Sequence, residues 1–493
     1  MRIFLTVALL LCPFAGAQEI HDHAAPEQLG DVSFPISCQP EVQKEFNRAV
    51  ALLHSFAYTM AETAFRAAAE HDPRCAMAHW GIAMTSFHQL WQPPIAPAAY
   101  LPAQRKIDES LRIGAVTERE RKFIRAAALV FRGADSVPYE ARALRYEQAM
   151  ADLAGENRQD TEAQVFYALA LLANASPADK THARQKQAVA LLEPLFRSFP
   201  QHPGIAHYLI HACDNSELAT EGLPAARLYS KIAPSVPHAL HMPSHIFTRL
   251  GLWEDSIASN LAARDAAHRV RDAGEELHAM DYLVYAYLQL GRDTDAAQVI
   301  QQLKTMPSLD VGDFKIAYAS TVMPIRYAVE RGRWGDATVI TPPVGAPPPV
   351  TALAFWAKGI GLARTGHSAE ARKAADELHR IETQLYASAN DYRATEVGVM
   401  RREIMAWSAR AENQNDAAVQ LMREAADEED SVEKLPVTPG PIIPAREQLG
   451  DLLLVQGHPG LAAHEFKVAL SDAPGRRRAI RGLEEAAEHS PPK

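Results

Sequence analysis

The chain has 493 residues, a formal net charge of −10 and only four cysteines. A nucleic-acid-binding protein would be expected to carry a basic patch or stripe, so this charge argues against that class. The N-terminus carries a short apolar run, and no other apolar stretch reaches the roughly 20 residues that a membrane-spanning helix needs. We therefore expect no membrane span.

The N-terminus predicts a secretory signal peptide over residues 1–17. Arg2 precedes the apolar run 3–11, and the small residues 15–17 form a cleavage site before Gln18. We therefore expect a periplasmic or secreted protein. Residues 18–37 predict a disordered lead. Its His-Asp-His triplet, 21–23, could bind copper weakly, although a solvated tail is the simpler interpretation.

Two histidine pairs lie near the middle of the chain, His207 with His211 and His241 with His245. Within each pair a spacing of four places both imidazoles on one face of a helix. Corresponding members of the two pairs are 34 residues apart (207 to 241, 211 to 245), which is the length of a tetratricopeptide repeat of two helices. The pairs are thus expected at equivalent places on the first helices of two stacked hairpins.

Recurring small residues and prolines predict an all-α fold of about eleven antiparallel helix hairpins in a right-handed superhelix. The array is expected over 38–340 and 351–488, with a polar capping helix over 475–488. Thr117 and Glu120 predict a capping box at the start of one helix. The proline-rich segments 341–350 and 435–444 predict loops that space the hairpins, because proline cannot continue a helix; a lid over the groove is the alternative.

The turn glycine Gly251 and the aromatic Trp253 set the register of the repeats, and this register turns a group of polar residues towards the concave groove. Neutral imidazoles bind zinc, copper or iron, and two histidines one helical turn apart can chelate one ion. We therefore expect the two histidine pairs to converge on one transition-metal ion, with neighbouring residues completing the shell or orienting an imidazole. The candidate ligands are His207, His211, His241 and His245, and the additional candidates are His238, Asp214, His278, Asp281 and Tyr285.

Two functions stay open on this pattern. The first is a scaffold that binds a protein or peptide in its groove and holds a metal ion there. The second is a metal-dependent hydrolase or oxidoreductase, with Glu217, Glu275 or Glu276 as a nearby acid. No nucleophile elbow, phosphate-binding glycine loop or dinucleotide fingerprint occurs in the sequence.

Several further residues carry expectations of their own. Cys38 and Cys75 lie about one repeat apart and are candidates for a disulfide, whereas Cys213 falls at a packing position. His54 and His88 are also 34 residues apart; they would join the site only if the superhelix curls back. Pro243, inside an expected helix, predicts a kink that frees the carbonyl of Ala239.

The chain resembles a family of exported bacterial tetratricopeptide-repeat proteins, mostly of unassigned function. The resemblance covers nearly the whole chain after the signal peptide, and its most specific part is PHALHMPSHIFTRLGLW, residues 237–253. It implies a helical-repeat fold and export, and it implies no particular chemistry.

Overall fold

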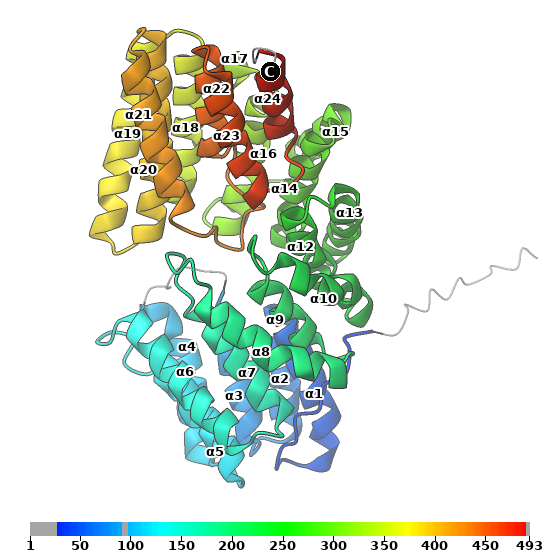
Figure 1. The fold of residues 1–493 in the computed structure, drawn as a ribbon. Coiled ribbons are helices and arrows are strands. Elements are labelled where there is room, and N and C mark those ends of the chain that lie inside the picture. Colours follow the sequence, from blue (N-terminus) through cyan, green and yellow to red (C-terminus); the bar gives the residue numbers. More distant parts are fainter. Residues whose placement is uncertain (1–26, 91–96, 490–493) are drawn as a thin grey trace, which may run out of the picture.

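A computed structural model of the chain describes residues 27–90 and 97–489, and the regular structure in these ranges is entirely helical. Consecutive helices pair as hairpins, and each hairpin packs against the next. Figure 1 shows the N-terminal hairpins in blue to cyan and the C-terminal hairpins in yellow to red, joined through the central green helices. The predicted all-α hairpin array is confirmed.

The hairpins in the described residues agree with the predicted number. In chain order, the paired helices are α1 (Gln43–His54) with α2 (Tyr58–His71), α3 (Ala76–Met84) with α4 (Leu101–Ile113), α5 (Glu118–Phe131) with α6 (Tyr139–Glu156), α7 (Thr161–Ala173) with α8 (Ala183–Ser198), α9 (Pro203–Ala212) with α10 (Ala219–Ile232), α11 (Pro237–His241) and α12 (Pro243–Arg249) with α13 (Trp253–Val270), α14 (Ala273–Gln289) with α15 (Asp293–Thr305), α16 (Phe314–Val329) with α17 (Trp334–Ala337), α18 (Pro348–Arg364) with α19 (Ser368–Ala387), α20 (Asp391–Ala411) with α21 (Asn415–Asp430), and α22 (Ala445–Val455) with α23 (Pro459–Asp472).

Short elements complete the array. Two 3-10 turns, η1 (Pro40–Val42) and η2 (Pro97–Tyr100), precede α1 and α4, and α24 (Arg477–Glu488) packs on α23 where the capping helix was predicted. The capping box of Thr117 and Glu120 is present at the start of α5. At the kink predicted at Pro243 the helix is divided in two: α11 ends at His241 and α12 begins at Pro243, while Met242 between them keeps helical backbone angles.

The segment before the first hairpin is ordered from residue 27 onwards, so the prediction of a disordered lead is wrong for residues 27–37. Phe34 is fully buried and meets the rings of Phe46, Trp80 and Phe123. Ser37 donates to Glu120 from its backbone N–H at 2.7 Å and from its hydroxyl at 2.6 Å. The buried ring, the hydrogen bonds of Ser37 and the disulfide at Cys38 together hold this extended segment against the first hairpins. Residues 1–26, with the expected signal peptide and the histidine triplet, lie outside the described residues.

The N-terminal hairpins curl so that α1 contacts α9, which lies four hairpins later. Gly204 at the start of α9 permits this approach. A Cβ atom at this position would lie 2.7 Å from Cγ of His54. The end of α1 and the turn after it therefore lie against the helix that carries the first histidine pair.

The two proline-rich segments differ from their prediction. The loop predicted over 341–350 ends at residue 347, because Pro348 begins α18, where proline is favoured in the first turn. The segment 435–444 does more than space two hairpins. It packs back on the central helices: Arg326 of α16 donates to the carbonyl of Gly440 at 3.1 Å and to the hydroxyl of Thr438 at 2.9 Å.

The described cysteines are all accounted for. Cys38 and Cys75 are joined by a disulfide, which links the segment before α1 to the start of α3. Cys213 is a fully buried thiol packed against Gly222, and burial raises its pKa to about 12. Among the described helices, none combines the length and the apolar character that crossing a bilayer requires.

Candidate metal centre

Six buried histidines of the central hairpins form two neighbouring groups of three, which we call the first and the second triad. The first triad is His207, His211 and His238, and the second triad is His241, His245 and His278. In each triad the four-residue pair of one hairpin meets a single histidine from the first helix of the next hairpin. Within each triad, one nitrogen of every imidazole lies within 4.8 Å of the others.

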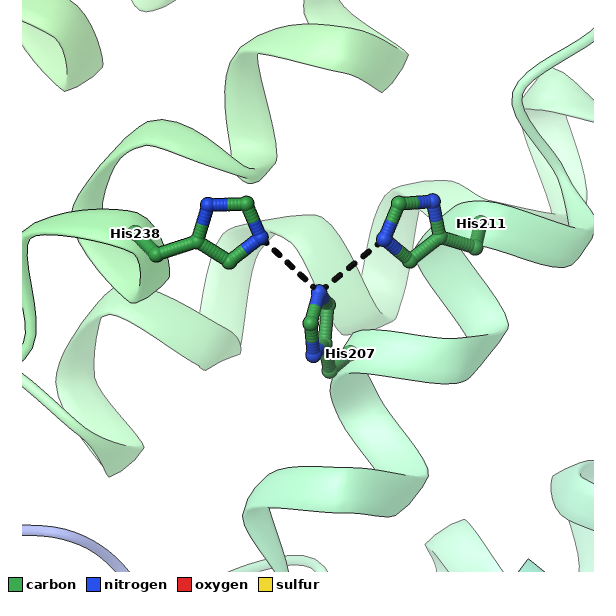
Figure 2. Close-up of side chains that lie close together, drawn as sticks. All are labelled: His207, His211 and His238. Carbon is green, nitrogen blue, oxygen red and sulfur yellow. Dashed lines mark hydrogen bonds between the residues drawn. The ribbon is translucent and has the colours of Figure 1, made fainter. Parts of the chain in front are cut away.

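The first triad is centred on His207 of α9. Its Nε2 atom lies 3.0 Å from Nε2 of His211 and 3.2 Å from Nε2 of His238, so the three nitrogens face a common point (Figure 2). Phe56, from the turn between α1 and α2, covers this group, with its ring centroid 4.4 Å from that of His207. The curl of the N-terminal hairpins thus closes the triad with an apolar side chain.

Two outer partners fix the tautomers in the first triad. Nδ1 of His207 donates to the backbone carbonyl of His54 at 2.6 Å, and Nδ1 of His238 donates to Glu275 at 3.3 Å. Burial alone would raise the pKa of Glu275, but Lys315 and His238 hold it well below its usual value, so the carboxylate accepts. In the neutral form of either imidazole, Nε2 therefore carries a lone pair and no proton.

The second triad is centred on His241, at the end of α11. Its Nε2 atom lies 3.0 Å from Nε2 of His245 in α12, and its ring centroid lies 4.2 Å from that of His278 in α14. The two triads are adjacent, since the ring centroids of His211 and His245 are 6.1 Å apart.

In the second triad, outer partners also accept the Nδ1–H of two histidines. His241 donates to the side-chain oxygen of Asn260 at 2.6 Å, and Asn260 is oriented because its amide nitrogen donates to the carbonyl of Ser256 at 2.8 Å. His245 donates to Asp214 at 2.9 Å. Lys434 and His245 hold the pKa of Asp214 well below its usual value against the opposing effect of burial. In the neutral imidazoles, Nε2 of His241 and Nε2 of His245 therefore each carry a lone pair and no proton.

The spacing of the facing nitrogens suits a shared ion. Two nitrogens that lie 2.0–2.1 Å from a tetrahedral zinc ion are roughly 3.3 Å apart. The observed separations of 3.0 and 3.2 Å are close to this value. Lone pairs at such distances repel each other unless a cation lies between them. A metal ion would supply that cation, and the carboxylate behind one histidine of each triad is a usual second partner of a metal-ligating imidazole.

Burial keeps these imidazoles in their metal-binding form. His211 is the most exposed of the six at 9 %, and each of the others is at most 2 % exposed. Burial lowers the pKa of His207, His211, His241 and His278 well below the usual value, and it also lowers the pKa of His245, which Asp214 partly offsets. The groups are therefore enclosed inside the array, whereas the sequence placed them on the wall of an open groove.

A third group, His54 with Glu162 and His202, has donors and acceptors that match. Glu162 accepts from His54 at 2.8 Å and from His202 at 3.0 Å, and the Tyr208 hydroxyl lies 2.9 Å from the other nitrogen of His54. Burial opposes ionisation of Glu162, but the two histidines lower its pKa to about 2. This group is satisfied as a hydrogen-bonded network without a metal ion. Its link to the first triad is the His54 carbonyl.

The remaining candidate ligands have different outcomes. Asp214 was expected either to complete the shell or to orient an imidazole. It orients His245, and it also binds Arg249 and Lys434. Asp281 pairs through Oδ1 with buried Arg326 at 3.0 Å. Tyr285 accepts at its hydroxyl from Arg476 at 2.9 Å. Neither residue belongs to a triad, because each meets an arginine of a later hairpin, and a contribution of Asp281 or Tyr285 to the site stays a prediction.

The acids and histidines outside the triads have local partners. Glu217 binds His182 and Lys186 near the surface, and Glu276 binds the exposed His268. His88 stacks on Tyr58 with ring centroids 3.9 Å apart, so it lies outside the triads although α1 curls back.

Sequence reasoning missed Asn260, the outer partner of His241, and the two lysines behind the outer carboxylates, Lys315 and Lys434. Asn260 is a fully buried polar residue on the mostly apolar buried face of α13, and this is the signal that could have found it. Lys434 is 220 residues from Asp214, and no local pattern connects the two.

The comparisons with known proteins identify no family. No protein-family model and no curated protein matches the chain. Among solved structures, the human IFIT1 dimer with PPP-AAAA matches with a TM-score of 0.41 and 11% identity, covering 92% of this chain and 95% of that one. The APC/C hetero-tetramer Cut9–Hcn1 matches with a TM-score of 0.37 and 11% identity, covering 90% and 76%. The TPR domain of P58(IPK) matches with a TM-score of 0.23 and 12% identity, covering 91% and 98%. These TM-scores are low, and we draw nothing from them about binding.

Proposed function

We propose that this chain is a tetratricopeptide-type helical-repeat protein that binds transition-metal ions, zinc, copper or iron, at its two histidine triads. The ligands are the six imidazoles, and the outer partners Glu275, Asn260 and Asp214 orient three of them. Because the ligands come from successive hairpins, a bound ion would also tie these hairpins together.

One observation carries the proposal. His241 and His245 face each other with Nε2 atoms 3.0 Å apart while both Nδ1–H groups donate elsewhere. In a purely structural cluster, one of these nitrogens would be expected to carry a proton towards the other, as in the network around Glu162. His207 and His238 repeat the arrangement in the first triad.

The enclosure of the triads favours a structural or storage role for the metal over an enzymatic one. A catalytic ion keeps one coordination position open to water or substrate, whereas a structural ion is closed off by protein. Since five of the six histidines are at most 2 % exposed, access for a substrate is poor. We therefore favour a metal-binding scaffold over a metal-dependent enzyme.

The test is metal analysis of protein purified from its native host without an affinity tag. We expect near-stoichiometric transition metal, and its loss in the double variant H211A/H245A, which leaves only two imidazoles in each triad. The matched control is H268A/H379A, because both of these histidines are exposed at the surface. A wild-type protein without metal, or a double variant that keeps its metal as the control does, would contradict the proposal.

A second candidate function, the binding of a protein or peptide segment, is favoured by a cavity of about 380 Å³ that residues of both the central and the C-terminal hairpins line. Tyr318, Trp356 and Tyr392 line it together with Thr395 and Pro439. Its volume is that of ordinary ligand pockets. Peptides selected from a random library on the wild-type protein should lose binding to T395W, which fills the cavity; peptides that bind both proteins equally would contradict this site.

We also propose that the protein is exported, with cleavage before Gln18. The support is the sequence of residues 1–17 and the Cys38–Cys75 disulfide, which suits an oxidising compartment.

A further inference from the structure

The cationic side chains that line the cavity of about 380 Å³ are all paired with acids. Each forms an ion pair with a carboxylate, and they are Lys180, Arg249, Arg393, Lys434, Arg446 and Arg476. Three acids of the lining, Glu396, Asp430 and Glu433, are partners in these pairs, and a fourth, Asp472, is exposed to solvent. Among the residues that the structure describes, the lining therefore offers an anionic ligand no cation that lacks a carboxylate partner.

The two remaining acids of the lining, Glu403 of α20 and Glu429 of α21, have neutral hydrogen-bond donors instead. Glu403 is 3% exposed, and it accepts from the indole nitrogen of Trp356 and from the amide nitrogen of Gln448, each at 2.5 Å. Glu429 accepts from the backbone N–H of Ala445 at 2.7 Å. Within the described part of the chain, neither carboxyl group forms an ion pair with a basic side chain. Buried carboxyl groups without a cationic partner are costly to a fold, and in a cleft they are typical of a binding site.

The surroundings of these two carboxyl groups suit a positively charged ligand. Burial and the charge of Glu429 raise the pKa of Glu403 well above its ordinary value, and burial raises the pKa of Glu429 to about 8. A cation beside them would favour their ionised forms. Tyr318, Trp356 and Tyr392 line the same cavity, and the faces of aromatic rings attract cations. The lining thus fits a ligand that combines a positive charge with an apolar stem.

We propose that the cavity binds a primary ammonium group, the lysine side chain of a bound peptide segment, through the carboxylates of Glu403 and Glu429. This inference rests on the second candidate function, the binding of a peptide segment. On binding, each carboxylic O–H bond that ionises releases its proton to solvent, and the ammonium group keeps its three N–H bonds and donates them to carboxylate oxygens.

The hydrogen bonds already present favour an ammonium group over a guanidinium group. A guanidinium binds best to both oxygens of one carboxylate in a planar fork. Both oxygens of Glu403 already accept a hydrogen bond, so this fork is not available there. Each oxygen has a second lone pair, and a compact ammonium can donate to single oxygens of separate carboxylates.

The experiment uses peptides that are selected from a random library on the full-length wild-type protein and that lose binding to T395W. We expect these peptides to share a lysine. Replacing that lysine by norleucine removes only the ammonium group and should weaken binding by about 10-fold or more, as fluorescence anisotropy would measure. The variants E403Q and E429Q should each weaken binding of the lysine peptide and leave the norleucine peptide unaffected. The matched control E424Q, at an exposed position of α21, should leave both affinities unchanged.

The affinity should also depend on pH in a defined direction. Because the carboxyl groups give up protons on binding, the affinity for the lysine peptide should rise between about pH 6 and 8. The affinity for the norleucine peptide should stay constant over the same range.

The possible outcomes separate the inference from the function on which it rests. Peptides that depend on the cavity but carry no lysine would overturn the ammonium site and keep the peptide-binding function, as would equal binding of the lysine and norleucine peptides. The comparison of the two peptides on the wild-type protein decides the matter even if E403Q does not fold. Selected peptides that all bind T395W as well as the wild type would instead overturn the peptide-binding function itself.

Discussion

Each triad depends on hydrogen bonds that decide where the imidazole protons sit. The contrast between His241 and His54 illustrates the point, because both are buried histidines with a polar partner at each ring nitrogen. His54 has a carboxylate on one side and a hydroxyl on the other, so its contacts are satisfied. His241 has an amide oxygen on one side and another lone pair on the other, so its contacts are incomplete without a cation.

The outer carboxylate of the first triad can be tested separately from the ligands. Replacing Glu275 by Gln removes the charge that orients His238 while keeping the shape of the side chain. We expect metal affinity at the first triad to fall by about 10- to 100-fold, the usual effect of losing such a partner. The measurement is a competition titration with a chelator of known affinity. The neighbouring variant E276Q, whose carboxylate binds the exposed His268, should leave the affinity unchanged, and equal effects of the two would contradict the role of Glu275.

Glu429, which lines the cavity, should make the free energy of unfolding depend on pH. Burial raises its pKa to about 8 from the ordinary value of 4.5. Its folded-state pKa lies above the unfolded value, so its stabilising contribution is complete below the unfolded pKa and is lost as pH rises through the folded pKa.

The variant E429Q mimics the protonated form and should remove this loss. Relative to E429Q, the wild-type protein should lose up to about 1.4 kcal/mol of unfolding free energy per pH unit between pH 5 and 8. Urea unfolding at several pH values measures the difference. E424Q, at an exposed position of the same helix, serves as the control and should follow the wild type. Parallel curves for wild type and E429Q would show that Glu429 ionises normally.

Among the helices, the contact between α1 and α9 positions the first triad. It places the His54 carbonyl and the Phe56 ring against His207, and Gly204 provides the space. We expect the variant G204A to push the His54 ring away and to destabilise the fold by about 1–3 kcal/mol, the usual cost of overpacking a core. Chemical unfolding would measure this, with metal-free protein so that binding does not contribute.

The control for that change is G155A in α6. An added Cβ there meets no atom within 4 Å, so the substitution should be neutral or stabilise by up to about 1 kcal/mol through helix propensity. If G204A proves as harmless as G155A, the close approach of α1 and α9 does not hold the first triad.

The hairpins and the central histidines were predictable because both rest on local spacing. A four-residue step defines a helix face, and a 34-residue step defines the repeat. One repeat later the register also turned His278 inwards, where it joins the second triad, whereas Asp281 and Tyr285 of the same helix meet arginines of later hairpins. There α13 is longer than a standard repeat helix, so His278 follows His238 by 40 residues instead of 34. Contacts such as Lys434 with Asp214 join distant hairpins and leave no periodic signal.

In the molecule as a whole, the C-terminal hairpins return to the central ones through buried ionic contacts. Arg476, just before α24, is fully buried and binds Glu447 of α22, Glu330 after α16 and the hydroxyl of Tyr285 in α14. One guanidinium thus connects three hairpins. The charges of Arg476 and of its two glutamates neutralise each other. Removing either the arginine or the glutamates would leave a buried charge without a partner, which would destabilise the fold.

The variant R476M should destabilise the protein by about 3–5 kcal/mol, because Glu447 and Glu330 would keep buried charges without a partner. Thermal and urea unfolding would measure this. As a control, R331M removes the partly exposed pair between Arg331 and Asp293, which should cost at most about 1 kcal/mol. Equal costs for the two variants would mean that the joint around Arg476 is held mainly by apolar packing.

The order of the triad residues along the chain has a consequence for biosynthesis. His207 and His211 are made before His238, and the carboxylate that orients His238 follows later at Glu275. The second triad is finished at His278, and the lysine behind its aspartate arrives only at Lys434, near the end of translation. A growing chain therefore presents the pair His207 and His211 first, and the histidines of the first triad are complete at His238, before the second pair is made. If the triads bind metal as proposed, both complete sets of ligands exist only once residue 278 has been made, and a chain that stops before residue 278 carries at most one finished triad.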